Sequence, residues 1–147
     1  MRELKFRAWD KKRNIMIGED YPDNWGSEKQ EYWADVFEIS LTGITEITQN
    51  ARFEIMQYTG LRDKNEKEIY EGDVVEIKGE EYYSNESFCT EDGEWMFSGE
   101  IAMNSLMWMA INRDSTAIPL CDLLHGDMEI DIIGNVFENP ELIKNDK

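Results

Sequence analysis

Histidine and cysteine are scarce in this sequence of 147 residues, which holds one histidine, His125, and two cysteines, Cys89 and Cys121. A single histidine excludes the multi-histidine zinc and facial-triad sites that many metalloenzymes use. Two distant cysteines do not make a disulfide framework, and they fit a reduced cytoplasmic setting. We therefore expect no disulfide, no metal site and no cofactor.

Long apolar runs are missing as well. The longest, residues 106–111, spans six residues, whereas a membrane helix needs about 20. The basic residues near the N-terminus are followed by no apolar run, so we expect no signal peptide. Glycine-rich phosphate loops of the GxGxxG and GxxxxGK[ST] types are also absent, which argues against nucleotide binding of those classes. These observations predict a cytoplasmic protein.

Basic side chains are outnumbered by acidic ones, 15 to 32, for a net charge of −17. Residues 66–100 carry two basic and twelve acidic side chains, a net charge of −10, while residues 1–30 are nearly neutral. This balance argues against direct nucleic-acid binding and against docking on an anionic membrane, because both depend on Lys and Arg. We expect partners to be basic proteins, cations or protein faces where charge matters little, and no small-molecule substrate is indicated.

Short apolar segments with turn signals between them predict a mainly β protein with a minor α component. Alternation predicts strands at residues 5–10 and 52–58, with Phe53 and Ile55 on one face and Met56 on the other. A turn is expected at residues 10–14, and a brief helical turn or loop at residues 119–127. Further strands are expected at residues 74–77, 95–104, 106–112 and 129–137, and an acidic loop at residues 79–94.

One amphipathic helix is expected over residues 28–38. Ser27 and Gln30 have the spacing of a capping box, and the apolar side chains of the segment fall on one face. The sequence leaves open whether this helix packs on its own sheet or on that of a neighbouring copy.

Three groups of residues invite a functional interpretation. The segment 63–68, DKNEKE, has the beginning of a calcium loop, but Glu68 and Val74 occupy the places of the required Gly and Glu. We interpret it as a hairpin turn in which Asn65 takes a positive φ. Cys121 and His125 have the spacing of a thiolate–base pair, but no third group orients them, so packing in a core or loop is favoured. The carboxylate groups Glu80–Glu81 and Glu91–Glu94 belong to the acidic loop, where solvation is the simpler explanation.

The aromatic and methionine side chains are the last candidates. Met107, Trp108 and Met109 lie at strand spacing, and we predict that they belong to the core. If their strand lies at an edge, one face becomes an adaptable protein-binding surface.

Three blocks of the sequence are distinctive: KFRAWDKKRNIM at 5–16, MQYTGLRDKNEKEIYEGDVV at 56–75 and IDIIGNVFENPELI at 130–143. Together they resemble the YopX family of bacteriophage and prophage proteins. The family's turn commonly reads DKNGK, whereas this chain has Glu66 in the place of the Gly. Because Glu suits a tight type I′ turn less well than Gly, we expect a longer or bulged loop there.

The resemblance implies a fold more than a function. It implies an SH3-type small β-barrel with an added N-terminal strand, in one domain over residues 1–147. Within it we expect an N-terminal part at 1–57, a barrel core at 58–143 and a tail at 144–147. Gly72 and Asp73 would form a kink after the hairpin. The family supplies no catalytic, cofactor-binding or metal residues, so none is assigned.

The resulting hypothesis is a phage-encoded accessory protein of the bacterial host cytoplasm that binds protein or assembles with itself. The alternative is an acidic protein that occupies the nucleic-acid site of a host protein, with carboxylates in place of phosphates. An enzyme is the second alternative, which would need a pocket with a perturbed carboxyl group or a reactive Cys121.

Overall fold

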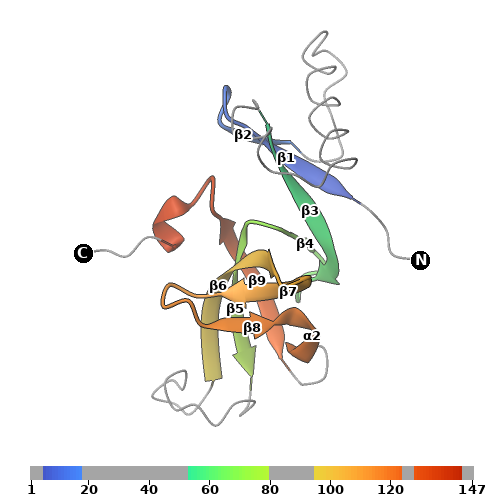
Figure 1. The fold of residues 1–147 in the computed structure, drawn as a ribbon, viewed down its shortest axis with the longest axis vertical. Helices are drawn as coiled ribbons and strands as arrows, with labels where there is room; N and C mark the ends of the chain where they lie inside the picture. The colour runs from blue at the N-terminus through green and yellow to red at the C-terminus, as the bar shows by residue number, and fades with distance from the viewer. Residues whose placement is uncertain (1–4, 18–52, 80–94, 124–127, 144–147) are drawn as a thin grey trace. The chain divides into compact units, whose positions relative to one another are not determined.

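The structure is a computed structural model that describes residues 5–17, 53–79, 95–123 and 128–143. These residues form two antiparallel sheets, so the mainly β class is confirmed (Figure 1). The expected helix at 28–38 lies outside the described residues. So does the expected acidic loop at 79–94, apart from Gly79, which ends a strand. None of the described helices is long and apolar enough to cross a membrane.

The chain divides into two compact units, residues 1–58 and residues 59–147. Each unit has its own cluster of buried side chains, and each is described by itself below. The single-domain organisation expected from the sequence remains a prediction.

The first sheet has the strand order β2-β1-β3-β4. Strand β1 (Phe6–Asp10) pairs with β2 (Ile15–Ile17) and with β3 (Phe53–Arg62), and β4 (Glu68–Tyr70) completes the sheet. The turn expected at residues 10–14 joins β1 to β2, a strand that was not expected. Asp10 closes this turn, because its Oδ1 accepts hydrogen bonds from the backbone N–H of Lys12 and Arg13 at 2.9 and 3.3 Å.

Burial in β1 and β3 departs from the predicted alternation. Phe53 and Met56 were expected on opposite faces, and both are buried. Arg7 is also buried, next to Ala8 in β1. Both strands are internal to the sheet, and buried side chains lie on both of their faces.

The second sheet contains five strands in the order β8-β7-β6-β5-β9. Its strands are β5 (Asp73–Gly79), β6 (Trp95–Asn104), β7 (Met107–Ile111), β8 (Ala117–Pro119) and β9 (Glu129–Asn135). The helical turn α2 (Leu120–Leu123) precedes β9, and the 3₁₀ turn η3 (Pro140–Leu142) follows it. Strands β5 to β8 form a meander, and β9 returns to pair with β5.

The expected strands at 74–77, 95–104, 106–112 and 129–137 are therefore confirmed, with small changes at their ends. Strand β8 was not expected, because Pro119 suggested only a break. Since β8 lies at an edge, Pro119 interrupts no inner ladder of hydrogen bonds. The predicted barrel is present as a curled half-barrel with β8 and β9 at its two ends.

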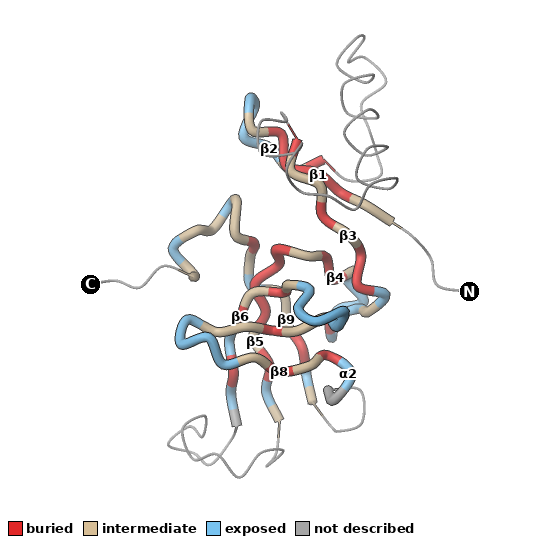
Figure 2. The backbone as a smooth tube through the Cα atoms, viewed as in Figure 1, coloured by how far each residue is buried: buried red, intermediate tan, exposed pale blue. Residues whose placement is uncertain are grey.

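The concave face of this half-barrel carries the larger core. Its buried segments appear red in Figure 2. The core cluster consists of Ile69, Val75, Ile77, Phe97, Ile101, Ala110, Ile118, Leu120 and Ile130. Phe97 and Ile101 project inward from β6, so the residues between them at even numbers project to the outer face.

Gly99 allows the sheet to curl at β6. A Cβ atom on this residue would lie 2.8 Å from both the backbone carbonyl carbon and the oxygen of Ile111 on β7. No side chain tolerates such a distance to backbone atoms, which do not rotate away as a flexible side chain would. Gly99 is therefore required by the close approach of two backbones, a typical role of glycine inside a strand.

We predict that Gly99→Ala destabilises the protein by about 1–3 kcal/mol, the range for overpacking a tightly packed site. The measurement is the free energy of unfolding from urea titration. Ser98→Ala is the matched control, because Ser98 is the adjacent residue and is exposed, and it should change stability by less than about 0.5 kcal/mol. Equal stability of the two variants would show that the sheet relaxes without loss around a methyl group at position 99.

Candidate functional site

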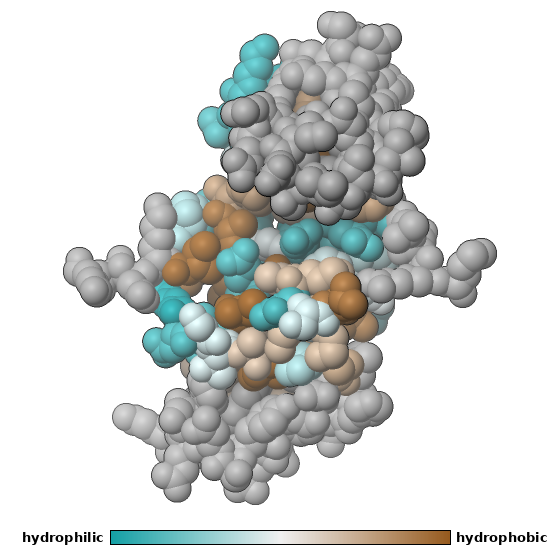
Figure 3. Space-filling view, in the orientation of Figure 1, coloured by the Kyte–Doolittle hydropathy of each residue, from teal (hydrophilic) through white to brown (hydrophobic). Residues whose placement is uncertain are grey.

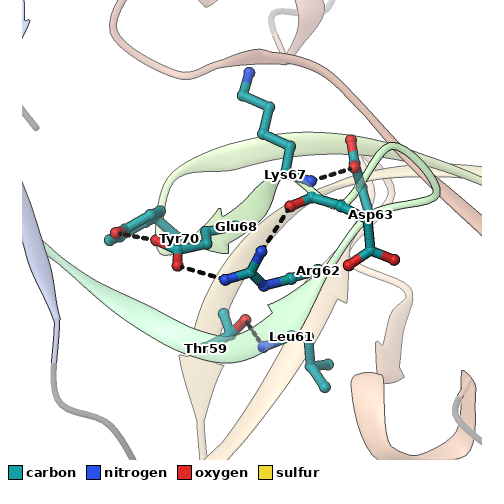
Figure 4. A network of polar contacts seen from close by, with 8 residues as sticks. Thr59, Leu61, Arg62, Asp63, Lys67, Glu68 and Tyr70 are labelled. Atoms are coloured by element: carbon teal, nitrogen blue, oxygen red, sulfur yellow. Dashed lines mark hydrogen bonds and ion pairs between the residues drawn. The ribbon is translucent and has the colours of Figure 1, made fainter.

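The segment that resembles a calcium loop is a hairpin loop held together by Asp63 (Figure 4). It comprises residues 63–67, between β3 and β4, so the longer loop expected from Glu66 is confirmed. Asp63 Oδ1 accepts hydrogen bonds from the backbone N–H of Asn65 at 2.8 Å and of Lys67 at 2.9 Å. Asp63 Oδ2 accepts one from the backbone N–H of Ile132 at 3.4 Å. The Asp63 carboxylate therefore fixes the loop by accepting hydrogen bonds from three backbone N–H groups.

The positive φ in this loop falls on Glu66, at 63°, and not on Asn65 as predicted. Arg62 stabilises the strained residue, because its guanidinium donates to the Glu66 carbonyl at 3.2 Å. The same guanidinium donates to Glu68 Oε1 at 3.1 Å, and the Tyr70 hydroxyl donates to Glu68 Oε2 at 2.9 Å (Figure 4). These hydrogen bonds stabilise the conformation of the loop, so we interpret the loop as structural and not as a ligand site.

Of the remaining sequence candidates, Cys121 is exposed in α2 and is not packed in a core. His125 and the carboxylate groups at 80–81 and 91–94 lie outside the described residues. The core prediction for residues 107–109 is wrong for Met107, whose exposed fraction is 44%. Trp108 is half-buried against the core, and its strand is internal to the sheet.

The β6–β7 hairpin ends in an exposed apolar tip. We define the hairpin tip as Met103, Leu106 and Met107, whose exposed fractions are 44%, 92% and 44%. Asn104 pairs directly with Met107, so Ser105 and Leu106 are the two central turn residues, with φ of 50° and 67°. Two positive φ angles define a type I′ turn, which favours Asn-Gly. A leucine in this conformation costs about 1–2 kcal/mol.

Trp108 adds a second unfavourable feature at the same end of the hairpin. Its backbone pairs with Met103 across the two strands. Its indole Nε1 is buried and finds no hydrogen-bond acceptor in the part of the chain that the structure describes. An unsatisfied buried donor is rare in native proteins and costs about 1–3 kcal/mol.

A pocket of about 640 Å³ lies on the outer face of the curled sheet. We call it the outer-face pocket. Its described walls combine apolar side chains with three charged ones. In Figure 3, brown apolar patches alternate with teal and pale ones over the described residues. The lining residues are Val74, Ser98, Gly99, Glu100, Ala102, Ile111, Asn112, Arg113, Asp114, Ile133, Leu142 and Ile143.

Two local features place η3 at the rim of this pocket. Gly134 in β9 leaves room for the turn, since a Cβ atom there would lie 2.7 Å from Leu142 Cδ1. Arg113, in the β7–β8 turn, donates from its guanidinium to the carbonyls of Glu141 and Leu142 at 3.1 and 2.8 Å. The guanidinium is therefore engaged with the backbone of the rim.

Glu100 projects into the outer-face pocket from the middle of β6. Its backbone pairs with Val74 and Ile111 on the two neighbouring strands, so apolar side chains flank the carboxylate on both sides. No hydrogen bond or ion pair joins it to any side chain among residues 5–17, 53–79, 95–123 and 128–143. Burial raises the pKa of Glu100 above its usual value, and the neighbouring charge of Glu71 raises it further.

With this geometry in hand, comparison with known proteins identifies the family. The family model described as YopX protein matches residues 5–144. The chain belongs to the YopX family. The match covers almost the whole chain, and the three resembling blocks of the sequence lie inside it.

Two solved structures are similar to this YopX-family chain. Protein EF1440 from Enterococcus faecalis shares 24% identity with a TM-score of 0.54, over 98% of this chain and 100% of its own. YopX from Bacillus subtilis shares 16% identity with a TM-score of 0.49, again over 98% and 100% of the two chains. The first likeness shows the fold alone. The comparison with curated proteins gives no match.

The YopX-like blocks build only part of the candidate sites. The block at 130–143 supplies Ile133 and Leu142 of the outer-face pocket, and the block at 56–75 supplies Val74. Glu100 and the hairpin tip lie outside all three blocks, and sequence reasoning missed both. A signal was present for Glu100, because it is the single charged residue in the strand 95–104.

We predict that Asp63→Asn destabilises the protein by about 1–2 kcal/mol at pH 7, because hydrogen bonds to a charged group are lost or weakened. Desolvation raises the pKa of Asp63, but the N–H donors of Lys67, Asn65 and Ile132 outweigh it and lower the pKa below 3.8. A depressed folded-state pKa gives stability that is present above the unfolded value and lost as the pH falls below it. The difference between variant and wild type should therefore shrink below pH 3.8.

The measurement for Asp63 is urea unfolding at neutral and at acidic pH. Glu129→Gln is the control, because Glu129 is exposed on β9, and it should change stability by less than about 0.5 kcal/mol at either pH. A pH-independent loss in Asp63→Asn would mean that the charge of the carboxylate contributes nothing.

We predict the opposite sign for Glu100→Gln, which should stabilise the protein at pH 7. The folded-state pKa of Glu100 is raised above 4.5, so the ionised form is disfavoured in the native state. The destabilisation appears as the pH rises through 4.5 and is complete above the folded-state pKa. Thermal unfolding from pH 4 to pH 8 should show a higher Tm for the variant at neutral pH and equal Tm values at the acidic end. A lower Tm at pH 7 would contradict this account of Glu100.

Proposed function

We propose that this YopX-family protein is a non-enzymatic accessory protein of a bacteriophage or prophage, and that it acts by binding another protein through the hairpin tip. The observation that carries the proposal is Leu106, 92% exposed at a φ of 67°. Glycine at this position would remove both the strain and the exposed apolar surface. A leucine there is unfavourable for the isolated protein, and contact with a partner supplies a reason for it.

The side chains around Leu106 support an interaction surface. Met103 and Met107 are each about half exposed, and methionine side chains adapt their shape to the surface of a partner. The unsatisfied Trp108 Nε1 lies at the same end of the hairpin. Strain and unsatisfied polar groups concentrate at functional sites more than at structural ones.

We infer further that the curled half-barrel is of the SH3 type. The supporting observation is its strand order, in which β9 returns beside β5, the first strand of the four-stranded meander. The short α2 turn before the closing strand agrees with this assignment. The fold by itself dictates no function, so the proposal rests on the hairpin tip.

The enzymatic alternative has less support from the described residues. Among the described residues, the lining of the outer-face pocket holds no histidine, cysteine, lysine or tyrosine that could act as a base or nucleophile beside Glu100. The alternative of an acidic protein that mimics nucleic acid also has less support from the described residues. Glu54, Glu68, Glu76 and Asp131 form ion pairs with Lys or Arg, so their charges are partly neutralised.

The test compares wild type with Leu106→Gly and Ser115→Gly. Both residues have a positive φ in an exposed turn, 67° and 64°, so both variants should be folded and as stable as wild type or more stable, by up to about 1 kcal/mol. Only Leu106→Gly removes apolar surface. In affinity capture from a bacterial host lysate, wild type and Ser115→Gly should retain a stoichiometric partner, and Leu106→Gly should lose it.

Three outcomes would count against the proposal. Capture of the same partner by Leu106→Gly would show that the hairpin tip is not the contact. A partner released by added duplex DNA would favour the acidic mimic, because such binding competes with nucleic acid and weakens with salt. A wild-type oligomer that Leu106→Gly converts to a monomer, measured by light scattering, would make the partner a second copy of the chain.

A further inference from the structure

The outer-face pocket contains a carboxylate that the described part of the molecule leaves without a counter-ion. Glu100 lies among the apolar side chains of Val74, Ala102 and Ile111, and Glu71 adds a second negative charge nearby. Glu100 is half-buried, and even partial desolvation of a charge is unfavourable without a partner. The pocket is therefore complementary to a group that brings positive charge.

The positive charge of Arg113 does not fill this role in the present geometry. Its Nε and one terminal nitrogen donate to the backbone carbonyls of Leu142 and Glu141 at 2.8 to 3.3 Å. The guanidinium is therefore hydrogen-bonded to the backbone of η3 at the rim of the pocket. The third charged residue of the lining, Asp114, is again acidic. The charges of the lining and of Glu71 therefore sum to a negative value, in agreement with the acidic balance of the chain.

The size and the walls of the pocket further limit the kinds of ligand that it can bind. A volume of about 640 Å³ is larger than a bare ion or a single amine requires, and it lies within the range of about 300–1,000 Å³ that is usual for organic ligands. Ile133, Leu142 and Ile143 offer apolar surface to a ligand at the rim, and Ile133 is 40% exposed. Long basic side chains combine an apolar stem with a cationic head and suit such a site.

We propose that the outer-face pocket binds a lysine or arginine side chain from a short basic segment of a partner protein, with Glu100 as the counter-ion. The apolar stem and the neighbouring residues of the segment contact Ile111, Ile133 and Leu142. Asn112 and Ser98 lie in the same lining and offer polar groups to the backbone of the segment. This inference rests on the proposed function in so far as the partner is a protein, but it uses a surface separate from the hairpin tip residues.

The test uses two peptides that differ only in charge. The probe is acetyl-Ala-Val-Arg-Val-Ala-amide, and its control carries citrulline, a neutral near-isostere, in place of arginine. In ¹H–¹⁵N NMR titrations at pH 7, the arginine peptide should shift the amides of Ser98, Ala102, Ile111 and Ile133. The citrulline peptide should bind at least about 10-fold more weakly, a difference of about 1.4 kcal/mol.

Two variants test whether the arginine peptide binds in the outer-face pocket. Glu100→Gln, which should be as stable as wild type or more stable, should lower the affinity for the arginine peptide by about 10-fold or more. Glu76→Gln is the matched control, because Glu76 lies on the same face of the sheet and is already paired with Lys78 at 2.6 Å. It should bind the peptide as wild type does, and so should Leu106→Gly.

The outcomes separate the pocket from the hairpin tip. Equal affinity for the two peptides, or unchanged affinity in Glu100→Gln, would overturn the proposal. Shifts confined to residues outside the pocket would overturn it as well. If n-butylammonium binds as tightly as the arginine peptide, the site takes a small free amine, and the assignment to a partner protein is wrong. Loss of peptide binding in Leu106→Gly would show that the tip, and not the pocket, holds the peptide.

Discussion

The backbone contact between Gly99 and Ile111 sets the curvature on which the larger unit of this protein depends. Strands β6 and β7 approach so closely there that a single Cβ atom would lie 2.8 Å from the neighbouring backbone. The curl brings Phe97 and Ile101 into the core on the concave side. The same alternation puts Glu100 on the convex side, between Val74 and Ile111. One glycine therefore allows both the core and the outer-face pocket.

Two hairpins of the chain show how differently a turn is stabilised. In the loop at 63–67 the Asp63 carboxylate accepts hydrogen bonds from backbone donors, and Arg62 binds the carbonyl of the residue with positive φ. In the β6–β7 turn the residue with positive φ is an exposed leucine. The first loop is built for stability, since its unfavourable conformation is compensated within the molecule. For the β6–β7 turn, we propose that contact with a partner protein compensates for the unfavourable conformation.

The outer-face pocket illustrates how a small sheet leaves a charge unpaired. The ion pairs of the described residues join side chains at exposed or half-exposed positions, such as Lys78 with Glu76 on the same face. Glu100 lies one strand away from this pair. Apolar side chains flank it, the Arg113 guanidinium donates to backbone carbonyls of the rim, and Glu71 and Asp114 add negative charge nearby. A cation from a partner would supply the counter-ion that this half-buried carboxylate lacks among the described residues.

Local patterns determined the β class, most strand positions and the family. Strands 95–104 and 129–135 follow from apolar residues between turn signals, and the longer loop at 63–67 follows from Glu66 in place of glycine. Patterns placed Phe53 and Met56 on opposite faces of their strand, but they did not show that the side chains on both faces are buried. They also placed the positive φ of the loop on Asn65, whereas Glu66 adopts it.

The tertiary structure alone decided the two candidate sites. The pocket needs η3, the β7–β8 turn and β6 in one place, and Gly134 and Arg113 bring them together through contacts between residues far apart in the sequence. The exposure of Leu106 depends on hairpin register, because a shift of one residue would move it out of the turn and into the strand. Sequence determines the local conformations, whereas pairing register and long-range packing determine which side chains remain available for binding.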